Sequence, residues 1–209
     1  VEYSGDHNDV ARAADRWATR ARTAWRLTRP PEIASSEREI DAIWRARKAL
    51  LPVIRAKSAA LGVPYSVVND VGVAPERLGD LLSAAGEIFG RHGLVAPVYG
   101  HAGSGNLHLR PLFRPGDADQ VRTVATEIYR LVVSLGGTIT AEHGMGRLRA
   151  PFLELEWGTQ IVGLMREVKR LFDPDDLLNP GVMFPPDRPD PGDELWSIPP
   201  DLEALSGHR

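Results

Sequence analysis

Two short glycine-rich segments carry most of the residues that could do chemistry. The first, VYGHAGSGNLHLRP, places His101 and His108 on either side of a glycine-broken stretch. The second, GGTITAEHGMG, supplies the adjacent pair Glu142 and His143. Two neutral imidazoles and one carboxylate suit zinc, or manganese when oxygen ligands and open positions are available. These residue types therefore predict a divalent metal site with room for a substrate.

The spacing of the two histidines sets a condition on such a site. On an uninterrupted strand, residues seven apart point to opposite faces of a sheet. His101 and His108 can bind one ion only if the backbone turns or bulges between them. Gly100, Gly103 and Gly105 allow this, because glycine adopts positive φ at low cost. We expect these glycines to let both rings point to one place.

The side chains of Glu142, His143 and Arg110 can each be given a role. If TITAE is a strand, Glu142 and His143 should diverge, so that Glu142 binds the ion and His143 transfers a proton. Arg110 follows His108 by two residues, and period-two alternation places it on the same face, where it could contact a carboxylate. The alternative for Arg110, and for Arg47, is an ordinary solvated surface charge.

Simpler interpretations of the glycine-rich segments stay open. A histidine is more often a surface or hydrogen-bonded core residue than a ligand. The pattern G-x-x-G-x-G could also bind a phosphate, but it lacks the Lys-Ser/Thr pair of a P-loop and the strand-turn-helix context of a dinucleotide site. The high number of glycines in both segments favours the metal hypothesis, since packing alone does not explain it.

Composition limits the class of protein. The 209 residues are 43% hydrophobic and 25% charged, with a formal net charge of -3, as in a globular domain. The absence of a basic run argues against a nucleic-acid partner. The absence of cysteine excludes disulfides, iron–sulfur ligation and thiolate chemistry from this chain. Without a long apolar run or signal peptide, we expect no transmembrane segment and a cytoplasmic location, with peripheral membrane attachment left open.

Apolar periodicity and turn residues give a coarse secondary structure. Helices are predicted from Asn8 or Asp9 to Leu27, after the Ser36–Glu39 capping box with a kink or restart at Pro52, after Pro75, from Asp117 to Leu135, and from Thr159 to Phe172. The helix after Pro75 is predicted to end at Gly93 and to face inward with Leu78, Leu81, Leu82, Ala85 and Phe89. The inward residues predicted for the helix from Asp117 are Val121, Val124, Ile128, Val132 and Leu135. Stretches rich in β-formers are Pro64 to Ala74, Val95 to Phe113, and TITAE. This alternation predicts an α+β fold, with a largely antiparallel sheet covered by helices.

The motifs GHAGSGNLH, GGTITAEHGMG and FDPDDLLNPGVMF, in this order and spacing, resemble the C-terminal cap domain of FAD-linked oxidases of the vanillyl-alcohol oxidase type. That group contains D-lactate dehydrogenases, D-2-hydroxyglutarate dehydrogenases and the flavin subunit of glycolate oxidase. The resemblance covers residues 1–184, which we expect to form one cap domain, incomplete at its N-terminus. The Pro- and Asp-rich residues 185–209 are expected to be a tail or linker.

The resemblance implies a role for each site residue. It implies that His101, His108 and Glu142 hold a divalent metal, zinc or manganese, which binds the substrate's hydroxyl and carboxylate. It also implies that His143 faces the flavin and takes the hydroxyl proton. The residues expected near FAD are Asn179, Gly181, Glu142 and His143. Since nothing in the sequence resembles the domain that holds most of FAD in this family, we expect the chain alone to be inactive.

Departures from the family pattern bear on the substrate. The resemblance implies a pattern for the sub-group of this family that acts on hydroxy diacids: a helix with W-x-x-R, followed by a threonine and a lysine, whose side chains bind the substrate carboxylates. Trp44 and Arg47 match the first motif, whereas Leu51 and Val68 stand at the other two positions. We therefore expect a lactate- or glycolate-like substrate, with Arg47 and Arg110 as the residues that contact it.

The function that the resemblance implies is FAD-dependent oxidation of a D-2-hydroxy acid to a 2-oxo acid. Its expected partners are a small 2-hydroxy acid, an FAD-binding domain and an electron-transfer partner. Two alternatives are a zinc-binding module that only stabilises the sheet, and a metallohydrolase that uses a metal-bound water and no flavin.

Overall fold

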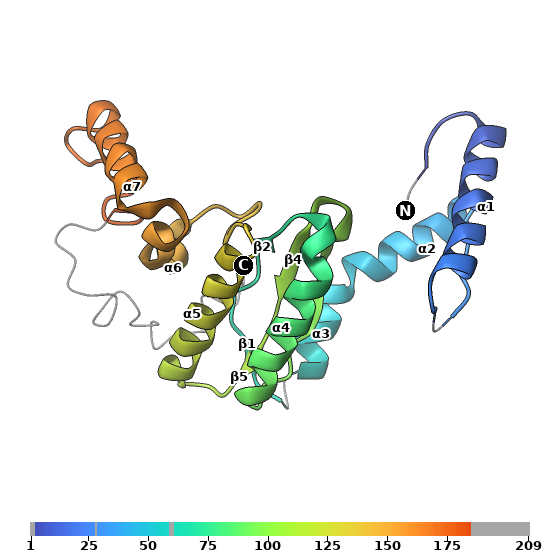
Figure 1. Cartoon of the computed structure of the whole chain (residues 1–209), viewed down its shortest axis with the longest axis horizontal. Coiled ribbons are helices and arrows are strands. Elements are labelled where there is room, and N and C mark those ends of the chain that lie inside the picture. The colour runs from blue at the N-terminus through green and yellow to red at the C-terminus, as the bar shows by residue number, and fades with distance from the viewer. Residues whose placement is uncertain (1–2, 28, 59–60, 185–209) are drawn as a thin grey trace. The chain divides into compact units, whose positions relative to one another are not determined.

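The computed structural model describes residues 3–27, 29–58 and 61–184 (Figure 1). The chain divides into two compact units after residue 53. The single cap domain expected over residues 1–184 stays a prediction, and the expected tail at residues 185–209 lies outside the described residues.

The first unit contains α1 (His7–Ala24) and α2 (Glu37–Lys48). The side chain of Asp6 caps α1, so the cap lies slightly before the predicted Asn8 or Asp9. The predicted capping box of α2 is confirmed, because Ser36 accepts a hydrogen bond from the Glu39 amide while the Glu39 carboxylate accepts one from the Ser36 amide.

The helix α3 (Leu50–Ser58) follows α2 after a break at Ala49. Pro52 lies in its first turn, where the missing N–H of proline would have no partner within the helix. The predicted restart at Pro52 is therefore confirmed.

The second unit contains two small antiparallel sheets. In the first, β1 (Val63–Pro64) pairs with β5 (Leu112–Phe113). In the second, the order is β2 (Val71–Gly72), β4 (Asn106–Leu109) and β3 (Val98–His101). The predicted α+β class with an antiparallel sheet is confirmed, although the strands are shorter than the β-rich stretches of the sequence.

The predicted TITAE strand is absent from the described residues. Thr138 forms only an isolated bridge to Gly72, and the Thr138 hydroxyl donates to the carbonyl oxygen of Thr140. The amide of Ala141 still donates to the backbone carbonyl of Asp70, but those of Glu142 and His143 donate to the buried carboxylate of Asp70 instead of a neighbouring strand. Side-chain acceptors have thus replaced the sheet ladder at these residues.

The central strand β4 separates an apolar core from a polar face. Leu107 and Leu109 belong to the core, together with residues of α4 (Leu78–Arg91) and α5 (Ala118–Ser134). These two helices pack against each other, as Figure 1 also shows. The residues of α5 predicted to be inward and found fully buried are Val121, Val124, Ile128 and Val132.

The inward face of α4 was predicted less accurately than that of α5. Leu82, expected inward, is 44% exposed, whereas Ile88 is buried. The predicted end of the helix is confirmed, because Gly93 has φ +65° and its amide donates to the carbonyl of Gly90.

The C-terminal part contains α6 (Gly146–Arg149) and α7 (Leu153–Phe172), joined by the short 3-10 turn η3 (Ala150–Phe152). Gly158 has non-helical backbone angles, so the uninterrupted part of α7 starts at Thr159, as predicted. Across the described part of the chain, no helix has both the length and the apolar character needed to cross a membrane.

Candidate metal and proton-transfer site

A β-hairpin brings the two motif histidines together. The register of β3 and β4 pairs Tyr99 with His108 and His101 with Asn106. Paired residues of antiparallel strands share a face, so all four side chains project from the same side of the sheet. The His101 and His108 rings lie 5.9 Å apart between centroids. The predicted turn between the histidines is therefore present.

The reversal depends on Gly105, which ends the 3-10 turn η2 (Ala102–Ser104). Gly105 has φ +75°, and a Cβ atom there would lie 1.8 Å from the carbonyl oxygen of Val73. A side chain would meet both backbone strain and backbone contact, so glycine is required at this position.

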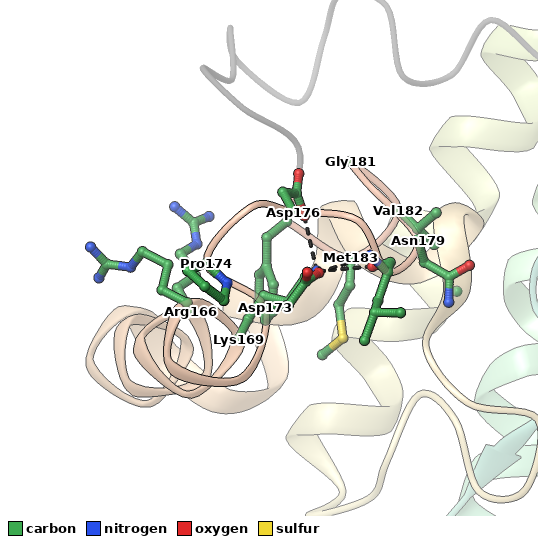
Figure 2. A pocket seen from close by; sticks show the side chains of 13 residues that line it. Arg166, Lys169, Asp173, Pro174, Asp176, Asn179, Gly181, Val182 and Met183 are labelled. Carbon is green, nitrogen blue, oxygen red and sulfur yellow. Dashed lines mark hydrogen bonds and ion pairs between the residues drawn. The ribbon is translucent and has the colours of Figure 1, made fainter.

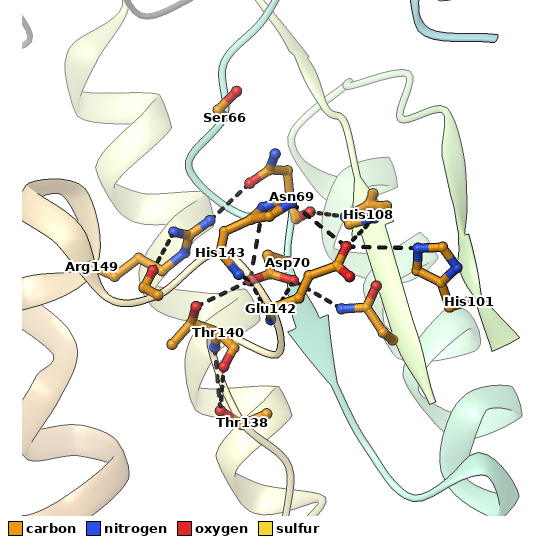
Figure 3. A network of polar contacts seen from close by, with 12 residues as sticks. Ser66, Asn69, Asp70, His101, His108, Thr138, Thr140, Glu142, His143 and Arg149 are labelled. Carbon is orange, nitrogen blue, oxygen red and sulfur yellow. Dashed lines mark hydrogen bonds and ion pairs between the residues drawn. The ribbon is translucent and has the colours of Figure 1, made fainter. Parts of the chain in front are cut away.

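Three imidazoles surround one carboxylate oxygen (Figure 3). Glu142 Oε1 lies 3.1 Å from His108 Nε2, 3.6 Å from His143 Nε2 and 3.7 Å from His101 Nε2. Donors bound about 2.0–2.1 Å from one tetrahedral ion lie about 3.4 Å from one another. The predicted ligands His108 and Glu142 thus meet at a separation that suits a shared ion. The ligand atoms that all lie within 4.8 Å of one another belong to Asp70, His108, Glu142 and His143, whereas His101 is close to Glu142 but is not part of this group.

The hydrogen bonding of His108 suits a metal ligand. Its Nδ1 lies against the backbone carbonyl of Asn69. A carbonyl can only accept, so Nδ1 carries a hydrogen and Nε2 is the ring nitrogen that faces Glu142. A proton or a cation between Nε2 and Glu142 Oε1 would be shared by both atoms at their separation of 3.1 Å. An imidazole anchored in this way by a carbonyl is typical of metal ligands.

The prediction that Glu142 and His143 diverge is wrong. The His143 ring stacks on His108 with centroids 5.2 Å apart and planes 7° apart, and its Nε2 lies beside Glu142. The alternation expected of a strand does not apply, because these residues are not in one. The side chains of His101, Glu142 and His143 are 42–44% exposed, against 8% for His108, so the site is open on one side.

The sequence analysis missed the carboxylate beneath the site, Asp70, whose side chain is fully buried. Its Oδ2 accepts hydrogen bonds from the amides of His143 (2.7 Å) and Glu142 (3.0 Å) and from the Thr140 hydroxyl (3.0 Å). Its Oδ1 accepts one from the side chain of Asn106 (2.8 Å). Burial, the largest single influence, raises the pKa of Asp70, but these hydrogen bonds together outweigh it and lower the pKa below its usual value.

Arg149 is a second residue that was missed. Its buried guanidinium donates to the Asn69 side chain at 2.8 Å and to the Gly144 carbonyl at 3.0 Å. Asn69 in turn anchors His108 through its backbone carbonyl. The polar pair Asn69 and Asp70 within the apolar stretch YSVVNDVGV was the available signal, since buried polar residues need partners.

Arg110 lies on the ligand face of the sheet, as predicted. It donates to the Ser66 hydroxyl at 2.8 Å and to the Tyr99 hydroxyl at 3.2 Å, and the Tyr99 ring lies 4.9 Å from that of His108. Arg110 is only 6% exposed, so the surface-charge alternative is wrong for it. No carboxylate of the described residues is within ion-pair distance of this buried cation.

Arg47 belongs to α2 in the first unit, where its guanidinium lies 5.7 Å from the centroid of the Trp44 ring. Its contact with substrate stays a prediction. Two positions differ from the diacid pattern. Val68 is buried in the core of the second unit, and the side chain of Leu51 is not among those that the structure describes.

The predicted flavin contacts Asn179 and Gly181 lie in the turn after α7 (Figure 2). They line a cavity of about 790 Å³ together with Arg166, Lys169, Arg170 and Met183, among others. Lys169 forms ion pairs with Asp173 and Asp176 at this cavity. His101, His108, Glu142 and His143 do not line it, although Gly146, at the end of the second glycine-rich segment, does. Contact of Asn179 and Gly181 with FAD stays a prediction.

Known proteins are similar to this chain over most of its length. The family model described as FAD linked oxidases, C-terminal domain, matches residues 1–183. D-2-hydroxyglutarate dehydrogenase of Haemophilus influenzae is 33% identical over 171 residues, which are 80% of this chain and 16% of that protein. Glycolate oxidase subunit GlcD of Bacillus subtilis is 31% identical over 159 residues, 75% of this chain and 33% of the subunit.

A plant relative extends the comparison. The mitochondrial D-lactate dehydrogenase (cytochrome) of Arabidopsis thaliana is 31% identical over 147 residues, 69% of this chain and 25% of that protein. The chain thus aligns with one third or less of each of these relatives. Because the family match runs through nearly the whole sequence and confirms the resemblance carried by the motifs, this chain belongs to the family of FAD linked oxidases, C-terminal domain.

Proposed function

We propose that this chain is the metal- and substrate-binding part of an FAD-dependent oxidoreductase that converts a D-2-hydroxy acid to a 2-oxo acid. The observation that carries the proposal is the convergence of His108 Nε2 and His101 Nε2 on one oxygen, Glu142 Oε1, at 3.1 and 3.7 Å. The names of the relatives support the substrate class, because glycolate, lactate and 2-hydroxyglutarate are all 2-hydroxy acids.

In this proposal His101, His108 and Glu142 hold a zinc or manganese ion. Such an ion would supply Lewis acidity to the substrate's hydroxyl and carboxylate oxygens. His143 accepts the hydroxyl proton. Its ring is 44% exposed and stacked on His108, so it stands at the open side of the cluster, where a substrate can approach.

Arg110 binds the substrate's carboxylate. A guanidinium has five N–H donors, and the partners of Arg110 are the neutral hydroxyls of Ser66 and Tyr99. A buried cation without an acidic partner is costly, and an anionic ligand would offset that cost. Val68 and Leu51 offer no second cationic or hydroxyl group of the kind expected for a diacid, so a lactate- or glycolate-like substrate is proposed.

FAD, held mainly by another domain, would supply the hydride acceptor. Asn179 and Gly181 are the proposed contacts of this chain with the flavin, together with Glu142 and His143. A chain without the FAD-binding domain is then expected to show no turnover, because the oxidant is lacking.

The experiment that tests this function is His143→Ala in an intact protein that carries both the cap and the FAD-binding domain. Metal content is expected to persist, while kcat for oxidation of D-lactate or glycolate falls by about 100-fold or more, as for loss of a general base. Unchanged turnover would contradict the proposal and favour a structural zinc module. The exposure of three of the four side chains already argues against that alternative, since structural zinc sites are closed.

A metallohydrolase is distinguished by colour and substrate. If the intact protein lacks the visible absorption of a flavin and hydrolyses esters or amides, the oxidoreductase proposal fails. A yellow protein whose absorption bleaches when a D-2-hydroxy acid is added anaerobically supports it, because bleaching reports flavin reduction.

A further inference from the structure

Asp70 connects the two motif segments from beneath. It precedes β2, and its donors come from both sides of the site: Asn106 on β4, and Thr140, Glu142 and His143 in the second glycine-rich segment. It is 0% exposed. The cost of burying a carboxylate charge is often offset by a nearby cation. For Asp70 it is offset by hydrogen bonds, so its role is to accept from these four donors.

Asp70 stands close enough to the cluster to be mistaken for a ligand. One of its oxygens lies within 4.8 Å of the ligand atoms of His108, Glu142 and His143. Both oxygens, however, already accept hydrogen bonds, and Oδ2 alone accepts from two backbone amides and one hydroxyl. An ion could bind Asp70 only by displacing donors that would then be buried without partners. The distance from Oδ2 to His143 Nδ1, 3.8 Å, is also too long for a hydrogen bond.

The two hydrogen bonds from backbone amides to Asp70 explain why the neighbouring side chains of Glu142 and His143 converge. In a strand the N–H groups of adjacent residues point in opposite directions, and so do their side chains. Here the N–H groups of Glu142 and His143 both point at Oδ2 of Asp70. This bends the backbone into a turn and brings the Glu142 carboxylate and the His143 ring to the same place, opposite His108.

We infer that Asp70 is a positioning residue: it acts through Glu142 and His143 by fixing their backbone, and it does not bind the metal itself. The link to metal binding and proton transfer rests on the proposed function above. The anchoring of the two amides does not, so it can be tested on the metal-free chain.

The first test compares Asp70→Asn with wild type by amide hydrogen exchange in the 209-residue chain, monitored by NMR. Asparagine has one acceptor oxygen where the carboxylate has two, and that oxygen carries no charge, so the hydrogen bonds from the two amides are weakened. The exchange rates of the Glu142 and His143 amides, divided by those of Val124 and Ile128 in the core, are expected to rise at least about tenfold. Taking this ratio removes the effect of a general loss of stability.

A matched control is Gln120→Leu, which also removes a side-chain hydrogen bond, from its amide to the carbonyl of His92 at the end of α4. The hydrogen bonds of Gln120 involve Asp117 and His92 and not the second glycine-rich segment, so the ratio should stay unchanged. A ratio unchanged in Asp70→Asn, or raised equally by Gln120→Leu, overturns the inference. If Asp70→Asn does not fold, wild type alone decides: coupling across the hydrogen bond from the Glu142 or His143 amide nitrogen to the Asp70 carboxyl carbon should be seen, and its absence at both overturns the inference.

The second test titrates Zn²⁺ into the same chains by calorimetry. Asp70→Asn is expected to weaken binding by about 10–100-fold, as loss of groups that orient ligands commonly does. At saturation with Co²⁺ the visible spectrum should match that of wild type, because the ligands are the same. A changed Co²⁺ spectrum would make Asp70 a ligand, and unchanged affinity would deny it a role in the site. If wild type binds no metal, the proposed function fails, while the exchange experiment still decides the role of Asp70.

Discussion

His108 and Asn69 are joined through Nδ1 of the imidazole and the backbone carbonyl, and this contact turns Nε2 toward Glu142. The carbonyl belongs to the residue next to Asp70, which holds the Glu142 backbone. One dipeptide therefore orients both sides of the candidate metal site, from a position about forty and seventy residues away from them in the sequence.

Arg149 supports this dipeptide and should be important for stability. Arg149→Met leaves the Asn69 side-chain oxygen and the Gly144 carbonyl without their buried donor, which is expected to cost about 2–4 kcal/mol in the free energy of unfolding. Urea denaturation measures this. Arg130→Met on the exposed face of α5 is the control, expected to change stability by less than about 0.5 kcal/mol. Equal effects of the two substitutions would contradict the prediction.

The hairpin turn offers a test with a neighbouring control. Gly105→Ala places a Cβ atom 1.8 Å from the Val73 carbonyl oxygen at φ +75° and is expected to destabilise the chain by about 2–4 kcal/mol. Gly103→Ala meets nothing within 4 Å and should be close to neutral. Thermal unfolding followed by circular dichroism distinguishes them, and similar Tm values would show that the hairpin does not need Gly105.

Arg110 should affect binding more than stability. In an intact enzyme, Arg110→Met is expected to raise KM for the hydroxy acid about 10-fold or more, because a charge-assisted hydrogen bond to the carboxylate is lost. The unfolding free energy should stay the same or increase, since a buried cation without an acidic partner is removed. Steady-state kinetics and urea denaturation measure the two effects. A large loss of stability with unchanged KM would assign Arg110 a purely structural role.

The contact between α4 and α5 predicts a modest pH dependence. The hydrogen bond from His92 lowers the pKa of Glu127 below its usual value, with a further contribution from Arg91. A lowered folded-state pKa stabilises the fold above the unfolded pKa of about 4.3, and this stabilisation is lost as pH falls through the folded value. At this partly exposed site it amounts to about 0.5–1 kcal/mol. The free energy of unfolding of Glu127→Gln, measured by urea denaturation, should therefore be lower than that of wild type at pH 7 and equal to it near pH 3. The same difference between the two proteins at both pH values would contradict this.

Local signals in the sequence predicted the helices well. Asp117 caps α5 and Leu135 ends it, within one residue of the predicted limits, because capping and apolar periodicity act over a few residues. The capping box at Ser36 and Glu39 was predictable for the same reason. Leu82 was assigned inward because its spacing fits an apolar stripe, but the position of α5 decides which edge of that stripe is buried.

The sequence predicted the candidate ligands but not the residues that hold them in place. His101, His108 and Glu142 were proposed as ligands from residue types and glycine spacing. Asp70 and its donors at Glu142 and His143 lie more than seventy residues apart, and no local pattern links them. The strand expected at TITAE failed for this reason, since a distant carboxylate captured the amides that a strand would have paired.

The metal content of the chain, purified without chelator and measured by mass spectrometry, tests the site most directly when wild type is compared with His108→Ala. We predict about one zinc or manganese ion per wild-type chain, and loss of that ion in His108→Ala while circular dichroism shows an intact fold. A wild-type chain that holds neither ion even after either is added, or a His108→Ala chain that retains the full amount, would contradict a metal centre at His101, His108 and Glu142.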